Sequence, residues 1–385
     1  MKVLLASHRY FPVPGGTEKV VQTLAEGLVR KGHAATVLTR AEPGTSASEW
    51  IGGVEVLRLP TRRIGGVRLP SGYLRTLHRS DADLFHLWGN RIWCADFYFP
   101  WARLFRWPQI LTGLGFYQYE MHPGPFDRWY FQRYLPRAVR RFDAYTTSSE
   151  RERRQLLGWK VPADRLVPVP LGVPLDEFDR PPPGVEALRA GWGLSRPLAA
   201  VYAGGFFENK RVDRLIDAVA AVRDRWALVA IGGDRPESPF GASACRRRAA
   251  AKGVEFRTPG ALSRPDLLRA LFAADAVVLG SSYEGFGLLP IEANAAGRPF
   301  VAFESGSLAE IARRGGGEIV ASPAGMAAAL DRLSDRSARE AMGARGRAEV
   351  GFYSGAAMVD RFLEVYRTVR ERREPDAPPL RAAAP

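Results

Sequence analysis

The chain has 385 residues, of which 46% are hydrophobic and 25% charged, as in an ordinary globular protein of about two domains. Its two cysteines, Cys94 and Cys245, exclude a disulfide framework and suit a reducing compartment. No run of about 18 apolar residues is present, and the apolar start is too short for a secretory signal. The composition therefore predicts a cytoplasmic protein without a membrane-spanning helix.

The net charge of +14 is concentrated in the first half of the chain. Residues 1–170 contain 25 Lys and Arg against 14 Asp and Glu, whereas residues 171–385 contain 30 against 27. A basic surface attracts nucleic acid, anionic lipid or phosphorylated substrates, but a solvated surface without a partner fits the same count. Nucleic acid is not expected, because the sequence contains no recognised nucleic-acid-binding module.

The first half alternates short apolar strands with helices. Its first strand, residues 2–7, leads through the loop HRYFPVPGG into a helix over residues 17–30. Gly15 and Gly16 lie directly before this helix, so its N-terminus is a candidate anion site, although most Gly-Gly pairs are only tight turns. Further strands are predicted at residues 34–39, 54–60, 82–87, 109–112, 144–148 and 166–169. This alternation predicts a doubly wound parallel sheet.

Asp81 and Asp83 form a D-x-D pattern of the kind that can hold a divalent cation. The pattern ends a predicted helix and enters a strand, and no third ligand is in view. A short motif of this kind gives little support for a metal site, and none is predicted.

Residues 88–116 combine nine aromatic side chains with Arg91, Arg103 and Arg106. Aromatic rings mixed with arginines suit a membrane interface, where the rings lie at the depth of the headgroups and arginine meets phosphate. They also suit stacking on bases or sugars. A core segment with a few outward arginines is equally compatible with this pattern.

The second half repeats the architecture of the first. Residues 173–196, with the run Pro181-Pro182-Pro183-Gly184, are predicted to connect two domains. A new strand at residues 198–202 is followed by the glycine turn Gly204-Gly205 and a helix over residues 212–225. Strands at 227–231 and 254–256 and helices at 264–273, 326–332 and 338–350 follow. Two Rossmann-like domains are therefore predicted, with ligands at the carboxyl ends of their strands, in the cleft between the domains.

Residues 276–302, AVVLGSSYEGFGLLPIEANAAGRPFVA, read as strand, loop, helix, turn and strand, with the strands at residues 276–279 and 300–303. A helix that begins near Leu288 behind the loop Glu284-Gly285-Phe286-Gly287 offers free backbone N–H groups to a phosphate or diphosphate. Glu284 and Glu292 accept hydrogen bonds only, so each suits the hydroxyl groups of a ribose or a hexose. The stretch predicts a diphosphate held between two sugars. Surface carboxylates flanking an ordinary capped helix are the alternative.

Together these features resemble the retaining glycosyltransferases of family 4, which have the GT-B fold of two Rossmann-like domains. The resemblance covers about residues 1–372, and its specific part is Ser282, Glu284-Gly285-Phe286-Gly287 and Glu292-Ala293. These residues look like the family's S-x-x-E-G-F-G-L-x-x-x-E-A signature. The resemblance implies that Glu292 binds the donor ribose and that Glu284 faces the donor sugar. It also implies that the sugar and the diphosphate are held by the amides of Gly285, Phe286, Gly287 and Leu288.

Two further loops carry the resemblance. Gly204 with Lys210 resembles the family's G-R-x5-K loop, in which the lysine neutralises the diphosphate. Gly15-Gly16 with Glu18 resembles the G-G-x-E loop near the donor phosphate and the acceptor. The amphipathic helix at residues 356–373 resembles one that returns to the N-terminal domain. The implied domains are residues 1–172 and 197–355, with the linker 173–196 between them and a disordered tail at 374–385.

Three positions depart from the family pattern. Gly205 stands where the family usually has arginine, and Arg211, directly after Lys210, is the candidate substitute. Leu114 stands where a histidine often follows the strand ending at Thr112, and His122 is the candidate acceptor-side replacement. The P-N-G run reads Pro170-Leu171-Gly172. The donor-binding residues therefore match the family better than the charged groups around them.

The resemblance implies an enzyme that moves a hexose from a nucleotide-diphosphate sugar to an acceptor hydroxyl with retention, in the biosynthesis of a cell-envelope glycolipid, polysaccharide or other glycoconjugate. Lys210 and Glu284 are the expected catalytic residues. No metal or other cofactor is expected if Lys210, Arg211 and backbone N–H groups carry the charge. The expected acceptor is a glycan or lipid-linked, and the expected location is cytoplasmic, peripheral on the inner face of the plasma membrane through residues 88–116. The alternative is a nucleotide-sugar-binding protein with little or no transferase activity.

Overall fold

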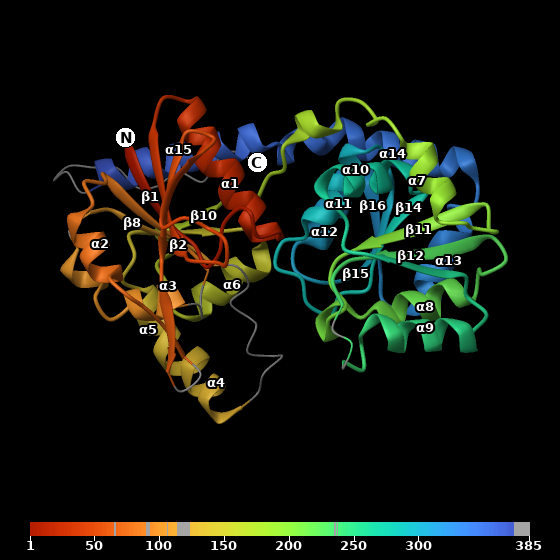
Figure 1. Ribbon diagram of the computed structural model, residues 1–385, viewed down its shortest axis with the longest axis horizontal. Helices are drawn as coiled ribbons and strands as arrows, with labels where there is room; N and C mark the ends of the chain where they lie inside the picture. Colours follow the sequence, from red (N-terminus) through yellow and green to blue (C-terminus); the bar gives the residue numbers. More distant parts are fainter. Residues whose placement is uncertain are drawn as a thin grey trace. The chain divides into compact units, whose positions relative to one another are not determined.

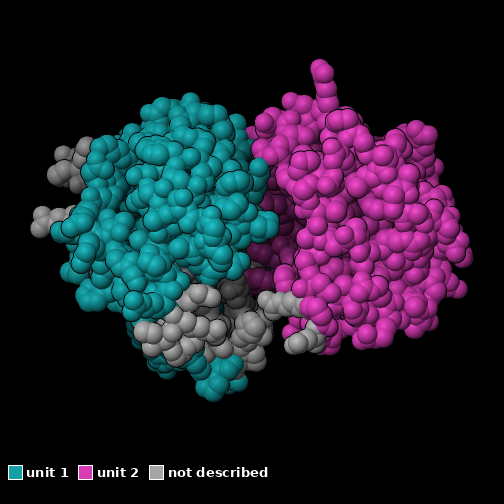
Figure 2. Space-filling model, viewed as in Figure 1, with its two compact units in different colours: residues 1–172, 355–385 teal, residues 173–354 magenta. Residues whose placement is uncertain are grey.

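The computed structural model describes residues 1–64, 67–89, 93–105, 107–113, 124–234, 236 and 238–372. The chain divides into two compact units (Figure 2). The first unit comprises Met1–Gly172 with Gly355–Pro385, and the second comprises Val173–Ser354. Residues 173–196, which the sequence suggested as a linker, belong to the second unit. They include a 3-10 helix, η5 (Leu175–Phe178), and α7 (Val185–Gly191).

In the described part of the first unit, eight strands form one sheet in the order β10-β9-β8-β7-β1-β2-β4-β3 (Figure 1). Every neighbouring pair is parallel except β3 with β4, so the predicted parallel sheet is confirmed. The strands are β1 (Lys2–Ala6), β2 (Ala34–Arg40), β3 (Ser48–Ile51), β4 (Val54–Leu59), β7 (Leu84–Trp88), β8 (Gln109–Thr112), β9 (Ala144–Thr147) and β10 (Leu166–Pro168).

The sequence did not predict β3 or the separate hairpin of β5 (Thr61–Ile64) and β6 (Val67–Pro70). The sequences of β3 and β5, SEWI and TRRI, are at least half charged or polar and lack the apolar run of a buried strand. Such strands form because a neighbour supplies backbone partners, which the sequence of one segment does not show.

Helices cover both faces of the first unit's sheet (Figure 1). They are α1 (Gly16–Arg30), α2 (Tyr73–Arg79), α3 (Trp93–Tyr98), α4 (Pro125–Trp129), a π-helical turn η3 (Tyr130–Tyr134), α5 (Leu135–Val139), α6 (Glu150–Gly158) and α15 (Gly355–Glu371). One core cluster takes a buried side chain from each of five successive strands in the sheet: Leu38, Leu4, Phe85, Leu111 and Tyr145.

Most of the described aromatic rings of residues 88–116 contribute to the interior of the first unit. Trp88, Tyr98 and Phe99 are buried, and the rings of Phe105 and Trp107 stack with their centroids 5.0 Å apart. The core interpretation therefore holds for these rings, whereas Trp101 is exposed.

The C-terminal helix α15 is tied to the sheet by a buried polar chain. His86 in β7 contacts the Tyr366 hydroxyl through Nδ1 at 2.6 Å and the Thr112 hydroxyl through Nε2 at 2.7 Å. Thr112 in turn contacts the Thr146 hydroxyl in β9. Buried polar groups need hydrogen-bond partners, so these side-chain contacts fix the position at which the apolar face of α15 packs on the sheet.

We expect acid to destabilise the first unit through His86. Burial lowers the pKa of His86 to about 3, whereas an unfolded histidine has a pKa of about 6.5. Above pH 6.5 the residue is neutral in both states and adds no pH dependence. Below about pH 6.5 the unfolded chain takes up the proton first. The free energy of unfolding then falls by up to about 1.4 kcal/mol per pH unit, until the folded state also titrates near pH 3.

Urea unfolding of wild type and His86→Gln at several acidic pH values tests this expectation. The free energy of unfolding should fall more steeply with decreasing pH in wild type. Equal slopes would contradict the assignment.

The second unit contains, among its described residues, a six-stranded sheet in the order β13-β12-β11-β14-β15-β16, and every pair is parallel. The second predicted parallel sheet is thereby confirmed. The strands are β11 (Leu198–Ala203), β12 (Trp226–Ile231), β13 (Phe256–Gly260), β14 (Ala276–Leu279), β15 (Phe300–Phe303) and β16 (Gly317–Val320). The helices besides α7 are α8 (Val212–Ala220), α9 (Ala242–Ala251), α10 (Arg264–Ala273), α11 (Leu288–Ala295), α12 (Leu308–Ile311), α13 (Pro323–Arg332) and α14 (Arg336–Glu349).

Helix α8 is shorter than predicted. It ends at Ala220 rather than at residue 225, because residues 221–225 form the turn that brings the chain into β12 at Trp226. A buried parallel strand fixes where the preceding turn must end, and periodicity within the helix does not report this constraint.

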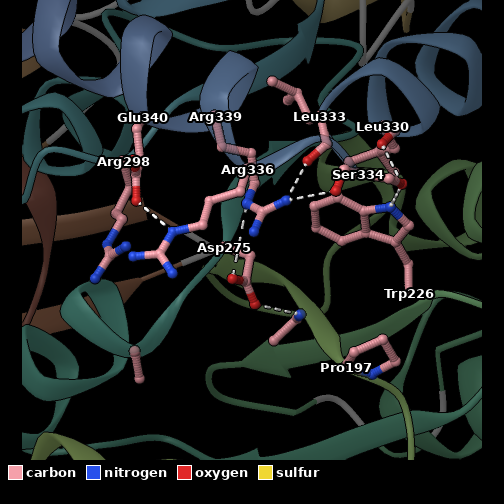
Figure 3. A network of polar contacts seen from close by, with 12 residues as sticks. Pro197, Trp226, Asp275, Arg298, Leu330, Leu333, Ser334, Arg336, Arg339 and Glu340 are labelled. Atoms are coloured by element: carbon pink, nitrogen blue, oxygen red, sulfur yellow. Dashed lines mark hydrogen bonds and ion pairs between the residues drawn. The ribbon is translucent and has the colours of Figure 1, made fainter.

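A polar network closes the amino end of this sheet. Asp275, directly before β14, accepts hydrogen bonds from the Ala199 amide and from Arg189, both at 2.8 Å. Figure 3 shows that Arg339 also forms an ion pair with the Asp275 carboxylate. Nη1 of Arg339 donates to the carbonyl oxygens of Leu333 and Ser334, directly after α13. Trp226 donates to Ser334 beside it. The network holds the strand ends opposite to those where ligands bind in such sheets.

Chain order reverses between β11 and β14, since β11 is followed by β12 on one side and β14 lies on the other. Ligands of open α/β sheets bind outside the carboxyl ends of the strands at such a switch point. The same reversal occurs in the first unit between β1 and β7. These two edges therefore contain the loops to consider for function.

Candidate functional site

The loops that follow β11 and β14 lie in direct contact. The Ser282 amide donates to the Asn209 carbonyl at 2.9 Å, and the Asn209 side chain donates to the Tyr283 carbonyl at 3.4 Å. A side chain on Gly280 would lie 2.4 Å from the Arg211 carbonyl oxygen, so glycine is required for this close approach. The two loops therefore form one structure at the switch point.

This contact brings Lys210 and Glu284 together, 74 positions apart in the sequence. The Lys210 ammonium lies 2.6 Å from Glu284 Oε2, and the Ser281 hydroxyl donates to the same oxygen at 3.1 Å. Both charged side chains are mostly buried. An ammonium carries three donors, so Lys210 has the capacity to bind an anion while it contacts Glu284.

The loop after Glu284 has space beside one of its two glycines. A side chain on Gly285 would meet nothing within 4 Å, whereas one on Gly287, at φ 88°, would lie 2.5 Å from Leu308. Phe286 is buried, and its carbonyl accepts a hydrogen bond from Ser307. Leu288 then begins α11. The loop is thus held at Phe286 and Gly287 and has room for a ligand beside the Cα of Gly285, as an anion site at a helix N-terminus requires.

The loop after β11 explains the missing arginine. A side chain on Gly205 would lie 2.2 Å from the ring of Phe207, and one on Gly204 would lie 2.4 Å from the Tyr202 hydroxyl. Phe207 therefore occupies the space that an arginine at position 205 would need.

Arg211, the predicted substitute, forms a two-point ion pair with Asp213 at 2.9 and 2.8 Å. Its guanidinium lies 5.7 Å from the centre of the Phe240 ring. Its backbone is left-handed, at φ 47°, a conformation that non-glycine residues adopt at a cost. The ion pair with Asp213 ties Arg211 to the first turn of α8.

Glu292 lies within α11 and is buried except for a small edge. Its Oε1 accepts a hydrogen bond from Arg264 Nη1 at 2.5 Å. Sequence reasoning missed Arg264. The available signal was its position at the first turn of a helix that follows a glycine at the carboxyl end of β13, where ligands of such sheets bind.

In the first unit, Gly15 and Gly16 precede and begin α1, and Glu18 folds back over the loop. A side chain on Gly15 would lie 2.0 Å from Glu18 Oε2, and burial raises the pKa of the Glu18 carboxyl. Arg9 and Arg40 share one oxygen of Glu42 nearby, at 3.1 and 2.7 Å. Polar and charged groups thus line the carboxyl end of β1.

Four other positions from the sequence analysis remain. Leu114 and His122 lie outside the described residues. Asp81 contacts the Lys2 ammonium, and Asp83 accepts a hydrogen bond from the Lys2 amide at 2.8 Å.

Across the described part of the chain, no three His, Cys, Asp or Glu side chains come together in an arrangement for a metal ion. No helix among these residues is long and apolar enough to span a bilayer.

Gly232→Ala is expected to destabilise the second unit by more than about 2 kcal/mol, because Gly232 has φ 151° and an added Cβ would lie 1.7 Å from the Gly204 carbonyl oxygen. Gly233 is the matched control, since a Cβ there meets nothing within 4 Å. Thermal unfolding of both variants measures the difference. Equal stability of the two variants would show that the loop after β11 is not held as described.

Two family models match this chain. Residues 15–172 match the Glycosyl transferase 4-like domain, and residues 198–336 match Glycosyl transferases group 1. Together the two models match 297 of the 385 residues, and both describe glycosyl transferases: the chain is a glycosyltransferase built from these two domains. The glycosyltransferase is 28% identical over 379 residues to a glycogen synthase from Mycobacterium tuberculosis, an alignment that covers 90% of each chain.

Solved structures of other proteins share the glycosyltransferase's fold. Sucrose-phosphate synthase from Thermosynechococcus elongatus has a TM-score of 0.80 at 22% identity, with 95% of this chain and 98% of that one covered. HepE from Anabaena, solved in complex with UDP-glucose, has a TM-score of 0.79 at 16% identity, with 95% and 99% covered. The GT-B fold class expected from the sequence is confirmed.

Proposed function

We propose that this glycosyltransferase moves a hexose from a nucleoside-diphosphate sugar to an acceptor hydroxyl with retention at the anomeric carbon. The observation that carries the proposal is the contact between Lys210 and Glu284 at the sheet's switch point, beside Gly285, where an added side chain would meet nothing within 4 Å. The two contacting loops thus contain one cation, one carboxylate and a helix N-terminus. This set matches the charges and hydroxyl groups of a sugar diphosphate.

Each residue has a role in this proposal. Lys210 and the backbone N–H groups from Gly285 to Leu288 stabilise the diphosphate as it leaves, and Glu284 accepts hydrogen bonds from the donor sugar. Glu292 accepts hydrogen bonds from the ribose. The acceptor oxygen forms the new bond to the anomeric carbon as the bond to the diphosphate breaks, and the hydroxyl proton passes to the leaving diphosphate oxygen. The proposal needs no metal, because Lys210 and the amides supply the positive charge.

The donor is tested with a thermal-shift screen of UDP-, GDP- and ADP-sugars. UDP-glucose comes first, because HepE was solved with it. A ligand that binds only the folded state raises the melting temperature by mass action, so one donor series should raise it by several degrees at about 1 mM. No shift with any of the three series, in a sample that unfolds cooperatively, would overturn the proposed donor.

The second candidate is a nucleotide-sugar-binding protein with little transferase activity. The space beside residue 205, where the family usually places arginine, is filled by Phe207. Release of the nucleoside diphosphate from the bound donor, measured with a panel of glycan and lipid-linked acceptors, separates the two. Tight donor binding with no release above background would favour the binding protein.

We further propose that the first unit contacts an anionic membrane, as expected for an acceptor that is lipid-linked. Its exposed large apolar side chains include Leu104, Phe126 and Trp129, exposed by 71%, 64% and 52%, and Trp101, exposed by 42%. The rings of Phe126 and Trp129 lie 5.9 Å apart. In Figure 1 α4, which carries both, projects from the sheet of this unit.

Arginines accompany these apolar side chains. Arg128, Arg133 and Arg137 are exposed on the continuous helical segment of α4, η3 and α5. Guanidinium groups beside aromatic rings match a headgroup layer that is anionic at its surface and apolar below it. This surface takes over the role proposed for residues 88–116, most of whose described rings are in the core. A cytoplasmic location at the inner face of the plasma membrane is proposed on the same ground.

Replacing both Phe126 and Trp129 by serine is expected to weaken binding to vesicles with about 30% anionic lipid by at least tenfold, because about 2–4 kcal/mol of apolar transfer energy is lost. Trp50→Ser is the matched control, since Trp50 is 72% exposed on β3 of the same unit. Sedimentation with the vesicles at low salt measures both. The surface would be ruled out if wild type did not sediment, or if the double variant bound as tightly as Trp50→Ser.

A further inference from the structure

Arg264 joins two carboxylates that come from distant parts of the second unit. Its Nε and Nη2 donate to Glu177 Oε2 at 2.8 and 2.5 Å, and its Nη1 donates to Glu292 Oε1 at 2.5 Å. Glu177 lies in η5, Arg264 is the first residue of α10, and Glu292 lies within α11. The guanidinium also lies 5.7 Å from the centre of the Phe178 ring. It is held on three sides.

Arg264 supplies a positive charge that balances the buried negative charge of the Glu292 carboxylate. The Glu292 side chain is 10% exposed, and a carboxylate this buried is stable as an ion only beside an opposite charge. Without the guanidinium, the carboxylates of Glu177 and Glu292 would face each other unshielded. Their like charges would then repel each other, and the orientation of Glu292 would be lost.

The contact with Arg264 also sets the direction of the Glu292 carboxylate. An ionised carboxylate has about four acceptor positions, and Arg264 Nη1 fixes one of them on Oε1. Fixing a carboxylate through one oxygen sets the direction of the other positions, which is how an outer partner orients a ligand-binding group. The partner oxygen of Glu177 takes two donors of the same guanidinium, so Arg264 itself cannot rotate without losing both.

We propose that Arg264 is a positioning residue for the nucleoside: it holds the Glu292 carboxylate ionised and oriented, so that Glu292 accepts hydrogen bonds from the ribose hydroxyl groups. The inference rests on the proposed function. Arg264 acts through Glu292 and not on the diphosphate. It should therefore govern affinity for the ribose of the donor and have little effect on the rate of transfer from bound donor.

The simpler interpretation is that Arg264 only ties η5 to α10 and α11. Glu177→Gln separates the two, because it weakens that tie and keeps the ion pair between Arg264 and Glu292. The glutamine oxygen still accepts a hydrogen bond, so Arg264 stays in place. A purely structural role predicts similar effects of Glu177→Gln and Arg264→Met on nucleotide binding.

The test measures binding of UDP, GDP and ADP, of their 2′,3′-dideoxy forms and of inorganic pyrophosphate by isothermal titration. For the nucleotide that wild type prefers, we expect Arg264→Met to lower affinity by about 10- to 100-fold. The wild-type preference for ribose over dideoxyribose should largely vanish, and pyrophosphate affinity should stay unchanged. Glu177→Gln should stay within about threefold of wild type, and Arg264→Lys should fall between. In steady-state assays, Arg264→Met should raise the donor KM and change kcat by less than about threefold.

Three results would overturn the inference. One is an unchanged ribose preference in Arg264→Met. Another is a loss of pyrophosphate affinity equal to the loss of nucleotide affinity. The third is an equal effect of Glu177→Gln. Should Arg264→Met fail to fold, Arg264→Lys gives the same comparison, and an unchanged ribose preference there counts against the inference. If wild type binds none of the three nucleotides, the proposed function fails, and the inference fails with it. Binding by wild type with no effect of Arg264 rejects the inference alone.

Discussion

Lys210→Ala is expected to lower kcat by a factor of about 10²–10³ with the preferred donor. The ammonium is the cation that the structure places on Glu284, and the leaving diphosphate gains charge as its bond to the sugar breaks. Removing one preorganised group that stabilises developing charge typically costs about 3–4 kcal/mol of activation free energy. The remaining Glu284 carboxylate would then face the diphosphate without compensation.

Lys252→Ala is the matched control for this variant. Lys252 lies in the same unit, pairs with Asp217 at 3.4 Å and is distant in sequence from the two loops. Its removal should leave kcat within about twofold, since exposed ion pairs contribute little. A Lys210→Ala enzyme with the kcat of wild type would show that Lys210 does not stabilise the leaving group. Partial recovery in Lys210→Arg would support a role of its charge.

Glu292→Ala is expected to weaken binding of the nucleoside diphosphate by about 10²-fold. Hydrogen bonds to a charged partner contribute about 1.5–3 kcal/mol each, and a ribose offers two hydroxyl groups. The variant also leaves Arg264 paired with Glu177, so the cation is not stranded. Affinity for inorganic pyrophosphate should change little, because the lost contacts are to the sugar of the nucleoside.

Glu340→Ala provides the control for Glu292. Glu340 pairs with Arg336 on the exposed face of α14, one helical turn away (Figure 3). Its removal should not alter nucleotide affinity, and its stability cost should be a few tenths of a kcal/mol. Isothermal titration of both variants with the same nucleotide is the measurement. Unchanged affinity in Glu292→Ala would show that the ribose does not contact this residue.

The sequence predicted the elements whose apolar pattern is continuous. The strands at residues 109–112, 276–279 and 300–303 and the helix at 264–273 occur as predicted, because buried parallel strands and capped helices carry their signals locally. The prediction failed for β16, whose sequence GEIV begins with glycine and glutamate and therefore lacks a continuous apolar run. Pairing with β15 supplies what its own sequence lacks.

In the candidate site, too, the local features could be predicted from the sequence, whereas the long-range contacts could not. Gly285 and Gly287 were predicted from their loop, and the structure adds that Gly285 is open whereas Gly287 is packed against Leu308. Pairings across long sequence distances were not predictable. Nothing near Lys210 indicates its contact with Glu284, and nothing near Glu292 indicates Arg264. Position 205 could be interpreted only once Phe207 was seen to fill the adjacent space.

The central claim is that the loops after β11 and β14 hold a nucleoside-diphosphate sugar. The most direct measurement is isothermal titration of the wild-type chain with UDP-glucose, GDP-mannose and ADP-glucose, with Lys210→Ala and Glu292→Ala titrated in parallel. We expect wild type to bind one of them with a dissociation constant in the range of about 1 μM to 1 mM, and both variants to bind it more weakly. Full-strength binding by both variants would show that these loops do not hold the donor, as would a folded wild type that binds none of the three.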